Sequence, residues 1–388
     1  MIPPEGRVRL EIRRPADRML PDRLRRAARL VYLSSRTFLL LTLGVLRRRE
    51  RRPPSPARVS RILVVRADRI GDMALTTPAL TDLRDHFRKA EITVLAPPAP
   101  LSLLESHPAV DRRVPLTGRR LPEDLAGRFD LAIDFTPDED LRAALLTRAS
   151  GARFRGGFRA AGRQVCFSLR GPRADPRRHV LDLNRDLLET LGVPAKTAHP
   201  ILFVTAGELG AAQARLAALG AATPRIAVHP GGHYATQRWS PECFAELITL
   251  LTGRMGAACV VLAGPGEQEL CRRVCAATPD ALSPGPTTVR EMMALVASCD
   301  LFIGNNSGPL HIASALGLPT VSVMGPTDPL RFAPRGAADR VVRRDLPCSP
   351  CQRARCWHHT CLRSIEPEEV LAQAEAALER RLPREEAR

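Results

Sequence analysis

The stretch from Asp300 to Asp328 has the clearest structural pattern in the chain. An apolar run at 301–303 leads into a glycine-containing turn at 304–308, then into a helix pattern, and finally into a β-branched run at 320–323. Two strands joined by one short helix form a βαβ unit, so we predict a parallel sheet. The turn opens the helix at the carboxyl end of the first strand, where free backbone N–H groups and the helix dipole favour an anion such as a diphosphate. A tight turn without a ligand is the alternative interpretation.

Two earlier strands in the second half of the chain end in similar loops. The glycines in these loops are Gly231, Gly232, Gly264 and Gly266. Parallel strands place their carboxyl ends at one edge of a sheet, so we expect these loops and the turn at 304–308 to share one ligand. Arg238 is close enough to the first loop to meet negative charge on that ligand. The strands predicted here are at 225–229 and 258–263. The predicted helices are one at 241–251, one that follows the loop 264–267 and runs to about residue 276, and one at 291–299.

The first half of the chain repeats the alternation of strands and helices. A buried strand at 61–66 runs into a turn that contains Asp68, Arg69, Gly71 and Asp72. Ligands of doubly wound sheets bind at such strand ends, although a carboxylate there can also cap a helix. The other elements predicted in this half are strands at 92–96 and 129–134 and helices at 73–87, 101–106 and 141–149.

Together these patterns predict an α/β protein with two similar domains. The chain of 388 residues is long enough for both. Prolines at Pro194 and Pro200 mark the boundary, so we place one Rossmann-like, doubly wound domain at 60–200 and a second at 201–388. With ligand loops at the strand ends of both domains, we expect the two to face each other across a cleft.

The basic charge is concentrated at the N-terminus. Residues 1–60 carry 16 arginines and five acidic residues, a net charge of +11, whereas the whole chain carries +17. The remainder of the chain is therefore nearly balanced. Aromatic side chains that could stack on bases are almost absent from this segment, so we do not expect it to bind nucleic acid.

The N-terminal segment at 1–59 also contains an apolar run at 37–46, flanked by arginines. Ten apolar residues are too few to span a bilayer, and no small-residue cleavage site of a signal peptide follows them. The pattern favours a basic amphipathic tail in which residues 1–52 bind an anionic membrane surface, followed by a linker at 53–56. A solvated extension is the alternative.

Several motifs, taken together and in order, resemble glycosyltransferase family 9, the ADP-heptose:lipopolysaccharide heptosyltransferases. They lie at 61–80, 229–232, 238–239, 304–311 and 325–329, and the resemblance covers about residues 60–380. It implies a GT-B fold, with an ADP-sugar donor in the C-terminal domain and a lipopolysaccharide core acceptor on the N-terminal side. It also implies a cytoplasmic protein, which with a membrane-bound tail would be peripheral on the cytoplasmic face of the inner membrane.

The resemblance also assigns roles to individual residues. Asp72 matches the catalytic base, and Asp68, Arg69 and Gly71 lie beside it on the acceptor side. Within the donor site, Arg238 would meet the phosphates and Glu267 the ribose. The donor-binding residues implied are Gly231, Gly232, Arg238, Glu267, Asn306, Ser307, Gly308 and His311. His311 could equally be a packed side chain.

The implied reaction is a one-step inverting transfer in which the base deprotonates the acceptor hydroxyl and ADP leaves. No metal or other cofactor is expected, because the second domain has no Asp-x-Asp pair on a donor loop; the acidic run at 138–140 is more simply a helix start. The family usually has Asp where Asn306 stands, which leaves the donor sugar open. Two alternatives also stay open: a nucleotide-sugar binding protein without activity, and a GT-B sugar-nucleotide epimerase. An intact Asp72 argues against the first, and the motif at 69–72 against the second.

Ten cysteines form two groups. Six lie among apolar neighbours and are expected to be small buried residues: Cys166, Cys243, Cys259, Cys271, Cys275 and Cys299. The other four are spaced as in some structural zinc sites, with two histidines among them: Cys348, Cys351, Cys356 and Cys361. This cluster either binds structural zinc or forms a loop without metal.

Overall fold

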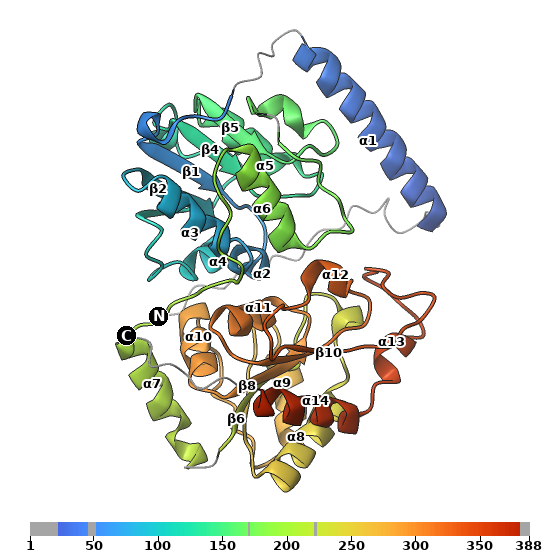
Figure 1. Ribbon diagram of the computed structural model, residues 1–388. Helices are drawn as coiled ribbons and strands as arrows, with labels where there is room; N and C mark the ends of the chain where they lie inside the picture. The colour runs from blue at the N-terminus through green and yellow to red at the C-terminus, as the bar shows by residue number, and fades with distance from the viewer. Residues whose placement is uncertain (1–21, 46–51, 170, 221–222, 381–388) are drawn as a thin grey trace, which may run out of the picture.

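The computed structural model describes residues 22–45, 52–169, 171–220 and 223–380. It contains two five-stranded sheets, one on each side of the predicted boundary near residue 200 (Figure 1). Every paired strand is parallel to its neighbour. In sheet order, the first sheet is β3 (Arg112–Pro115), β2 (Glu91–Ala96), β1 (Arg61–Val65), β4 (Leu131–Asp134) and β5 (Phe154–Gly157), and the second is β10 (Arg340–Val342), β9 (Thr320–Val323), β8 (Leu301–Asn305), β6 (Arg225–His229) and β7 (Ala258–Val261).

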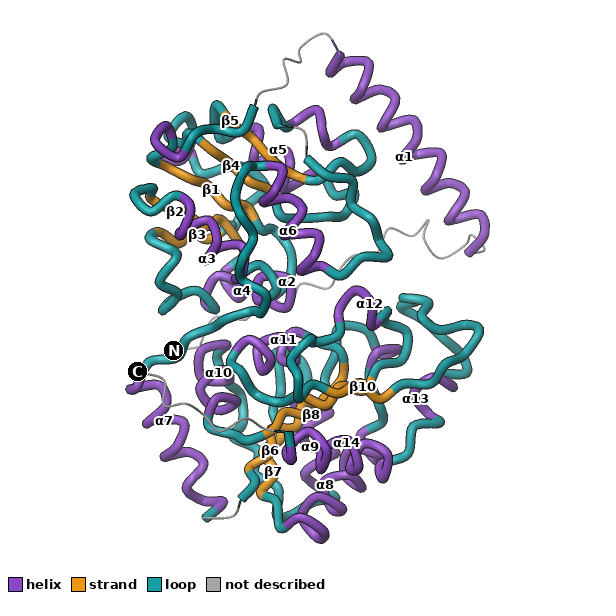
Figure 2. Tube along the Cα trace, viewed as in Figure 1, coloured by secondary structure: helices purple, strands orange, loops and turns teal. Residues whose placement is uncertain are grey.

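Helices cover both faces of each sheet, as the tube drawing shows (Figure 2). The α-helices before the boundary are α1 (Asp22–Val45), α2 (Ile70–Ala74), α3 (Thr77–His86), α4 (Pro98–Ser102), α5 (Leu141–Ala149) and α6 (Val180–Thr190). Those after it are α7 (Ala206–Leu216), α8 (Pro241–Met255), α9 (Gln268–Ala276), α10 (Val289–Ala297), α11 (Gly308–Ala315), α12 (Pro329–Phe332), α13 (Thr360–Arg363) and α14 (Pro367–Glu379). Short 3-10 turns are η2 (Pro56–Arg58), η3 (Glu123–Leu125), η4 (Arg163–Cys166), η5 (Ala217–Leu219) and η6 (Ala235–Gln237). The predicted α/β architecture with two Rossmann-like domains is confirmed.

The strand β1 explains why its sheet has two helical layers. Its side chains alternate between faces, and both faces are fully buried. Ile62 and Val64 join the core cluster beneath α2, α3, α4 and α6, whereas Leu63 and Val65 join the smaller cluster beneath α5. A strand buried on both sides reads as a continuous apolar run, which is why this one could be found in the sequence.

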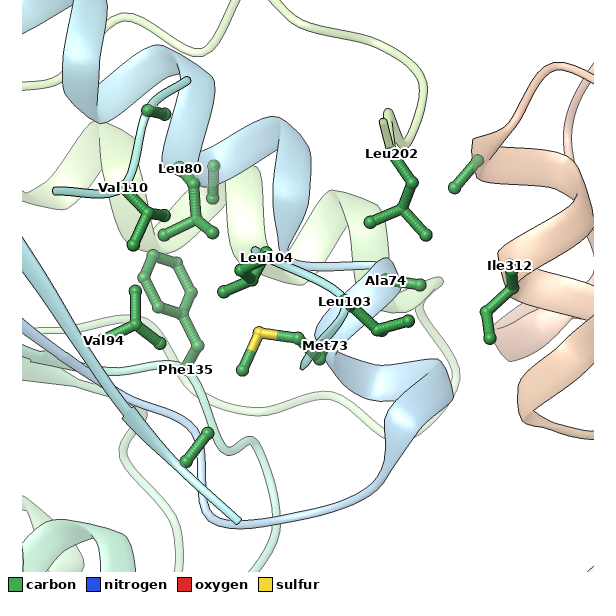
Figure 3. Close-up of a cluster of buried hydrophobic side chains, with 14 of the residues drawn as sticks. Met73, Ala74, Leu80, Val94, Leu103, Leu104, Val110, Phe135, Leu202 and Ile312 are labelled. Atoms are coloured by element: carbon green, nitrogen blue, oxygen red, sulfur yellow. The ribbon is translucent and has the colours of Figure 1, made fainter. Parts of the chain in front are cut away.

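The larger core cluster does not stop at the domain boundary. Figure 3 shows Leu202 and Ile312 from the second half of the chain beside Ala74 and Leu103 from the first. All four side chains are buried. Because these apolar side chains leave water together, the two domains are held against each other at this point.

One predicted helix is wrong in its extent. The pattern indicated one helix at 73–87, but the structure has α2 and α3 with a break at Leu75 and Thr76. Pro78 accounts for the break, because it has no N–H to donate to the carbonyl of Ala74 and its ring crowds that carbonyl. As a result, Asp72 lies in the first turn of α2 and not in the preceding loop.

Three strands and five helices were not predicted: β3, β5, β10, α6, α7, α12, α13 and α14. The strands β3 and β10 are at sheet edges and each buries one side chain, so neither has an apolar run. The strand β5 is half glycine, which weakens any strand signal. Pairing with a neighbouring strand, rather than local preference, forms these strands.

The N-terminal tail is described only in part, since 1–21 and 46–51 lie outside the described residues. Between them, 22–45 form α1, which packs against η4 of the first domain (Figure 1). No helix within the described residues is long and apolar enough to cross a membrane.

A buried ion pair supports the loop that follows β4. The guanidinium of Arg163 and the carboxylate of Asp134 are in contact, and both side chains have 0% exposure. Arg163 also donates a hydrogen bond of 2.6 Å to the carbonyl of Thr136, and another to that of Asp138. One buried cation thus fixes the strand end and the loop 135–140.

We predict that Arg163→Met destabilises the protein by about 3–5 kcal/mol, because the variant leaves the Asp134 carboxylate buried without its partner. Urea unfolding at neutral pH measures the loss. Arg177→Met, which removes an arginine that is 87% exposed, is the matched control and should change stability little. Equal stability of the two variants would show that water reaches Asp134.

Candidate active site

A cleft of about 620 Å³ lies between the two domains. It opens at the carboxyl ends of the central strands of both sheets, where the strand order reverses: between β1 and β4 in one and between β6 and β8 in the other. The first domain contributes Asp68, Arg69, Ile70, Gly71, Asp72, Leu75 and Pro100. The second contributes His229, Gly232, His233, Gln237, Ala263, Gly264, Pro265, Glu267, Thr287, Thr288, Val289, Met292, Asn306, Ser307, Gly308, Pro309, His311, Thr327 and Phe332. The loops expected to share one ligand therefore do meet.

Two carboxylates of the first domain share one buried guanidinium. Arg66 has 0% side-chain exposure; its Nε lies 2.8 Å from Oδ1 of Asp68, and its Nη2 lies 3.3 Å from Oδ1 of Asp72. The other guanidinium nitrogen donates to the carbonyl of Phe135. The side chains of Asp68 and Asp72 keep 20% and 24% exposure. Both line the cleft while the buried Arg66 guanidinium holds them in place.

The environment separates the two carboxylates chemically. Burial raises the pKa of Asp68 to about 8; Arg66 opposes the rise, while the neighbouring charges of Asp72 and Asp138 add to it. One guanidinium cannot fully compensate two carboxylates in a buried site. Arg66 lies closer to Asp68 than to Asp72, and the raised pKa of Asp68 distinguishes the two carboxylates.

The helices α2 and α11 contact each other at very close range where the two domains meet. A Cβ atom added to Gly71 would lie 2.8 Å from the imidazole Cδ2 of His311, and one added to Gly308 would lie 3.4 Å from Ile70. Glycine at 71 is thus required by the approach of the other domain. His311 is 5% exposed, and burial lowers its pKa to about 4, with Asp72 opposing the shift. A neutral, packed imidazole at the domain contact agrees with the packing interpretation of this residue.

Glu267 ties two loops of the second domain together. Its carboxylate accepts hydrogen bonds from the backbone N–H groups of Gly232 at 2.9 Å and Gly264 at 2.8 Å, and its Oε2 lies 3.1 Å from Nε2 of His229. Burial alone raises the pKa of Glu267, but the bonds from His229 and the two N–H groups outweigh it and lower that pKa to about 2. The carboxylate is therefore charged, lines the cleft and fixes the loop that contains Gly231.

Asn305 connects the loop after β6 to the loop after β8. Its Nδ2 donates to the carbonyls of Pro230 and Gly231, and its Oδ1 accepts from the backbone N–H of Trp239 at 3.0 Å. The side chain is fully buried at the end of β8. Asn305 thus sets the loop after β6 beside the loop after β8, a role that the sequence analysis missed.

The glycine-rich turn opens α11 as predicted. Ser307 is the N-cap residue but makes no side-chain cap bond, and its Oγ lies 3.3 Å from Nδ1 of His229. Asn306, Ser307 and Gly308 all line the cleft. The first N–H groups of α11 therefore face a space that is large enough for a ligand.

Among the described residues, the arginine that lines the cleft is Arg69 of the first domain, and not Arg238 as expected. Arg238 is half-buried, its Nε donates to the carbonyl of Gly232 at 2.8 Å, and it is not among the residues that line the cleft. Arg69 of the first domain does line it, and its Nη2 lies 3.1 Å from Nε2 of His233 in the second domain. His233 was not singled out in the sequence, because nothing in its spacing distinguishes it.

These loops, the cleft and the two sheets can be compared with known proteins. Residues 119–361 match glycosyltransferase family 9 (heptosyltransferase). The chain belongs to glycosyltransferase family 9. This finding confirms the family and the glycosyltransferase class that the motifs indicated.

Sequence relatives in this family are heptosyltransferases. The chain is 30% identical over 162 residues to lipooligosaccharide heptosyltransferase 2 of Campylobacter jejuni, a match that covers 39% of this chain and only about half of that protein. It is 24% identical over 356 residues to lipopolysaccharide heptosyltransferase 1 of Pseudomonas aeruginosa, which covers 82% of this chain and 98% of that protein.

Solved structures of family members have the same GT-B fold. A family 9 glycosyl transferase from Veillonella parvula aligns with a TM-score of 0.70 at 22% identity, covering 83% of this chain and 98% of the other. The ADP-heptose lipopolysaccharide heptosyltransferase II of Escherichia coli aligns with a TM-score of 0.67 at 23% identity, covering 82% and 98%. An E. coli heptosyltransferase with ADP-2-deoxy-2-fluoro heptose aligns with a TM-score of 0.62 at 20% identity, covering 81% of this chain and 99% of the other.

One further wall of the cleft in this family 9 protein was missed in the sequence. Thr287, Thr288 and Met292 line it from the start of α10. Thr288 caps this helix in a capping box with Glu291, which is the threonine-x-x-glutamate signature of a helix start. That signal was present, but the helix was predicted two residues too late. By contrast, Asp140 caps α5 by accepting from the N–H of Arg142, as expected of the acidic run at 138–140.

The cysteine predictions have mixed outcomes. Cys166, Cys259, Cys271 and Cys299 are buried as expected, whereas Cys243 and Cys275 are half-buried. The cluster of Cys348, Cys351, Cys356 and Cys361 has no disulfide. Within the described ranges, no group of three or more histidine, cysteine or acidic side chains is arranged to hold a metal ion.

We predict that acidification from pH 7 to pH 5 weakens the protein through His311. The folded state keeps this imidazole neutral down to about pH 4, whereas the unfolded chain takes up a proton near pH 6.5, so stability falls as the pH drops. In urea titrations, the native protein should lose about 2 kcal/mol more over this range than His311→Gln. Asp68 acts in the opposite direction but is present in both proteins. Equal losses would mean that His311 can be protonated in place.

Proposed function

We propose that this protein is an inverting glycosyltransferase that moves heptose from ADP-heptose to the core of a lipopolysaccharide. The heptosyltransferase relatives support the reaction class. The structural neighbours named for ADP-heptose and for a fluorinated analogue of it support the donor. Asn306 replaces the usual acid of the family, so the sugar is the part of the proposal that needs its own test.

Asp72 is proposed as the general base. The single observation that carries this role is the pair of carboxylates that Arg66 contacts at the edge of the cleft, where burial raises the pKa of the other one, Asp68, to about 8. The carboxylate of Asp72 beside the cleft can take the proton of an acceptor hydroxyl as that oxygen attacks the anomeric carbon. The bond from this carbon to the diphosphate breaks in the same step, and ADP leaves.

The departing diphosphate gains negative charge and needs electropositive partners. The N–H groups of Gly232 and Gly264 are already bonded to Glu267, so the partners proposed are the first N–H groups of α11 and the guanidinium of Arg69, which line the cleft. Such groups are aligned before the reaction, so they stabilise developing charge without reorganising. Arg238 is proposed to act from behind the loop, since it holds the carbonyl of Gly232.

We predict that Asp72→Asn lowers turnover of ADP-heptose onto a lipopolysaccharide core acceptor by about 10² to 10⁴, the usual contribution of a general base. The amide keeps the size of the side chain but cannot accept the proton. The dissociation constant of ADP, measured by calorimetry, should change little, because ADP is held by the other domain.

Two variants serve as controls for Asp72→Asn. Asp124→Asn changes a carboxylate of the same domain that lies outside the cleft and is 53% exposed, so turnover should stay intact. Asp68→Asn tests the next candidate. If Asp72→Asn turns over normally while Asp68→Asn does not, the base is Asp68; loss of both turnover and ADP binding in Asp72→Asn would make Asp72 structural.

A second variant tests the donor side. We predict that Arg238→Ala lowers turnover more than it raises the Michaelis constant of the donor, because the loop that it supports meets charge that grows as the bond breaks. Steady-state kinetics with ADP-heptose separates the two effects, with Arg254→Ala on the surface of α8 as the matched control. A change in the Michaelis constant alone would make Arg238 a uniform binding contact.

A further inference from the structure

The helix α1 has one face against the protein and one face away from it. Its half-buried positions, Leu33, Arg36, Thr37 and Leu40, recur at the spacing of a single helical stripe. On other sides of the helix, large apolar side chains stand in the open. They are Leu30 at 65% exposure, Val31 at 66%, Tyr32 at 62%, Phe38 at 73% and Leu39 at 58%.

The inner stripe is docked by specific contacts. The guanidinium of Arg36 donates to the carbonyls of Glu139 at 2.7 Å and Ala161 at 3.1 Å, and Arg29 pairs with the carboxylate of Glu139. Gly162, at φ +84°, lies so close to α1 that an added Cβ would be 3.1 Å from the Cα of Thr37. The helix therefore presents its outer face in a fixed orientation.

The outer face is suited to an apolar environment. From Leu30 to Val45 the only charged residue is Arg36, and it is engaged by the protein. The hydroxyls of Ser35 and Thr42 donate to carbonyls of the preceding turn, at 2.8 Å to Val31 and 2.9 Å to Leu39. Since these two hydroxyls are already satisfied within the helix, burying them costs little.

The two ends of this segment are strongly basic. Arg23, Arg25, Arg26 and Arg29 precede the apolar part, and Arg47, Arg48, Arg49, Arg51 and Arg52 follow it. An uncharged, apolar surface between two basic clusters suits one kind of partner, a bilayer leaflet with anionic headgroups. The apolar face would enter the acyl region, and the arginines would meet the headgroups. A buried protein interface would instead have to desolvate many of these arginines.

We propose that α1 is an in-plane membrane helix whose outer face enters an anionic leaflet while its inner stripe remains docked on the first domain. The dock includes the loop 135–140 between β4 and α5, and Asp138 in this loop is near enough to Asp68 to influence that carboxyl electrostatically. The helix thereby sets the acceptor side of the cleft at a constant height above the lipid surface. The inference rests on the exposed face and the charges, and it does not depend on which sugar is transferred.

The test is sedimentation of the full-length protein with lipid vesicles. The probe vesicles contain phosphatidylcholine alone or phosphatidylcholine and phosphatidylglycerol in equal amounts. We expect binding to the mixed vesicles only. Val31→Ser/Phe38→Ser should lower the partition coefficient by at least about tenfold, because two large apolar side chains no longer enter the leaflet. Arg25→Gln/Arg26→Gln should lower it by about fivefold for each arginine removed, and only on anionic vesicles.

Matched controls separate the helix from general effects. Leu145→Ser/Phe203→Ser removes apolar side chains of 53% and 38% exposure elsewhere on the surface and should leave the partition coefficient unchanged. Calorimetric ADP binding verifies that each variant is folded. Vesicle binding that Val31→Ser/Phe38→Ser retains in full would overturn the proposal. So would a loss of binding that the control variant shares, or sedimentation velocity without lipid showing that α1 instead joins two copies of the chain.

Discussion

The contact between α2 and α11 is the constraint on which the site depends. Gly71 and Gly308 allow these two short helices to approach until the backbone of one meets the side chains of the other, and His311 fills the space that a side chain at 71 would occupy. The apolar side chains of Ala74 and Ile312 extend the contact into a core shared by both domains (Figure 3). Because α2 carries Asp72 and the N-terminus of α11 faces the cleft, one packing interaction places the candidate base opposite the candidate diphosphate site.

Electrostatics then divide the work among side chains that packing has brought together. Arg66 is buried beneath two carboxylates and contacts both, and burial raises the pKa of Asp68 to about 8. On the donor side, Glu267 has lost its proton because His229 and two backbone N–H groups point at it. Its negative charge is used within the protein to shape the loops. Carboxyl groups lining one cleft thus differ in pKa according to their partners.

The sequence predicted the fold well where strands are buried on both faces, and poorly where pairing alone makes a strand. The central strands β1, β6 and β8 have continuous apolar runs, whereas the edge strands β3 and β10 do not. Motifs located Asp72, Gly308 and Glu267 because loops at strand ends follow a recognisable order. They could not show that Arg238 faces a carbonyl, that Asn305 pins two loops, or that Arg69 meets His233 across the cleft. Those contacts depend on how two domains sit together, and no local pattern encodes that.

The loop 135–140 is bonded to three separate parts of the molecule. Arg66 holds its first residue by the carbonyl of Phe135, and Arg163 holds the carbonyls of Thr136 and Asp138 from within the core. On the outside, Arg36 of α1 holds the carbonyl of Glu139. Three arginines from different elements therefore fix one short loop between the candidate base and the N-terminal helix. The backbone of this loop thereby links α1 to Arg66, the guanidinium that contacts both Asp68 and Asp72.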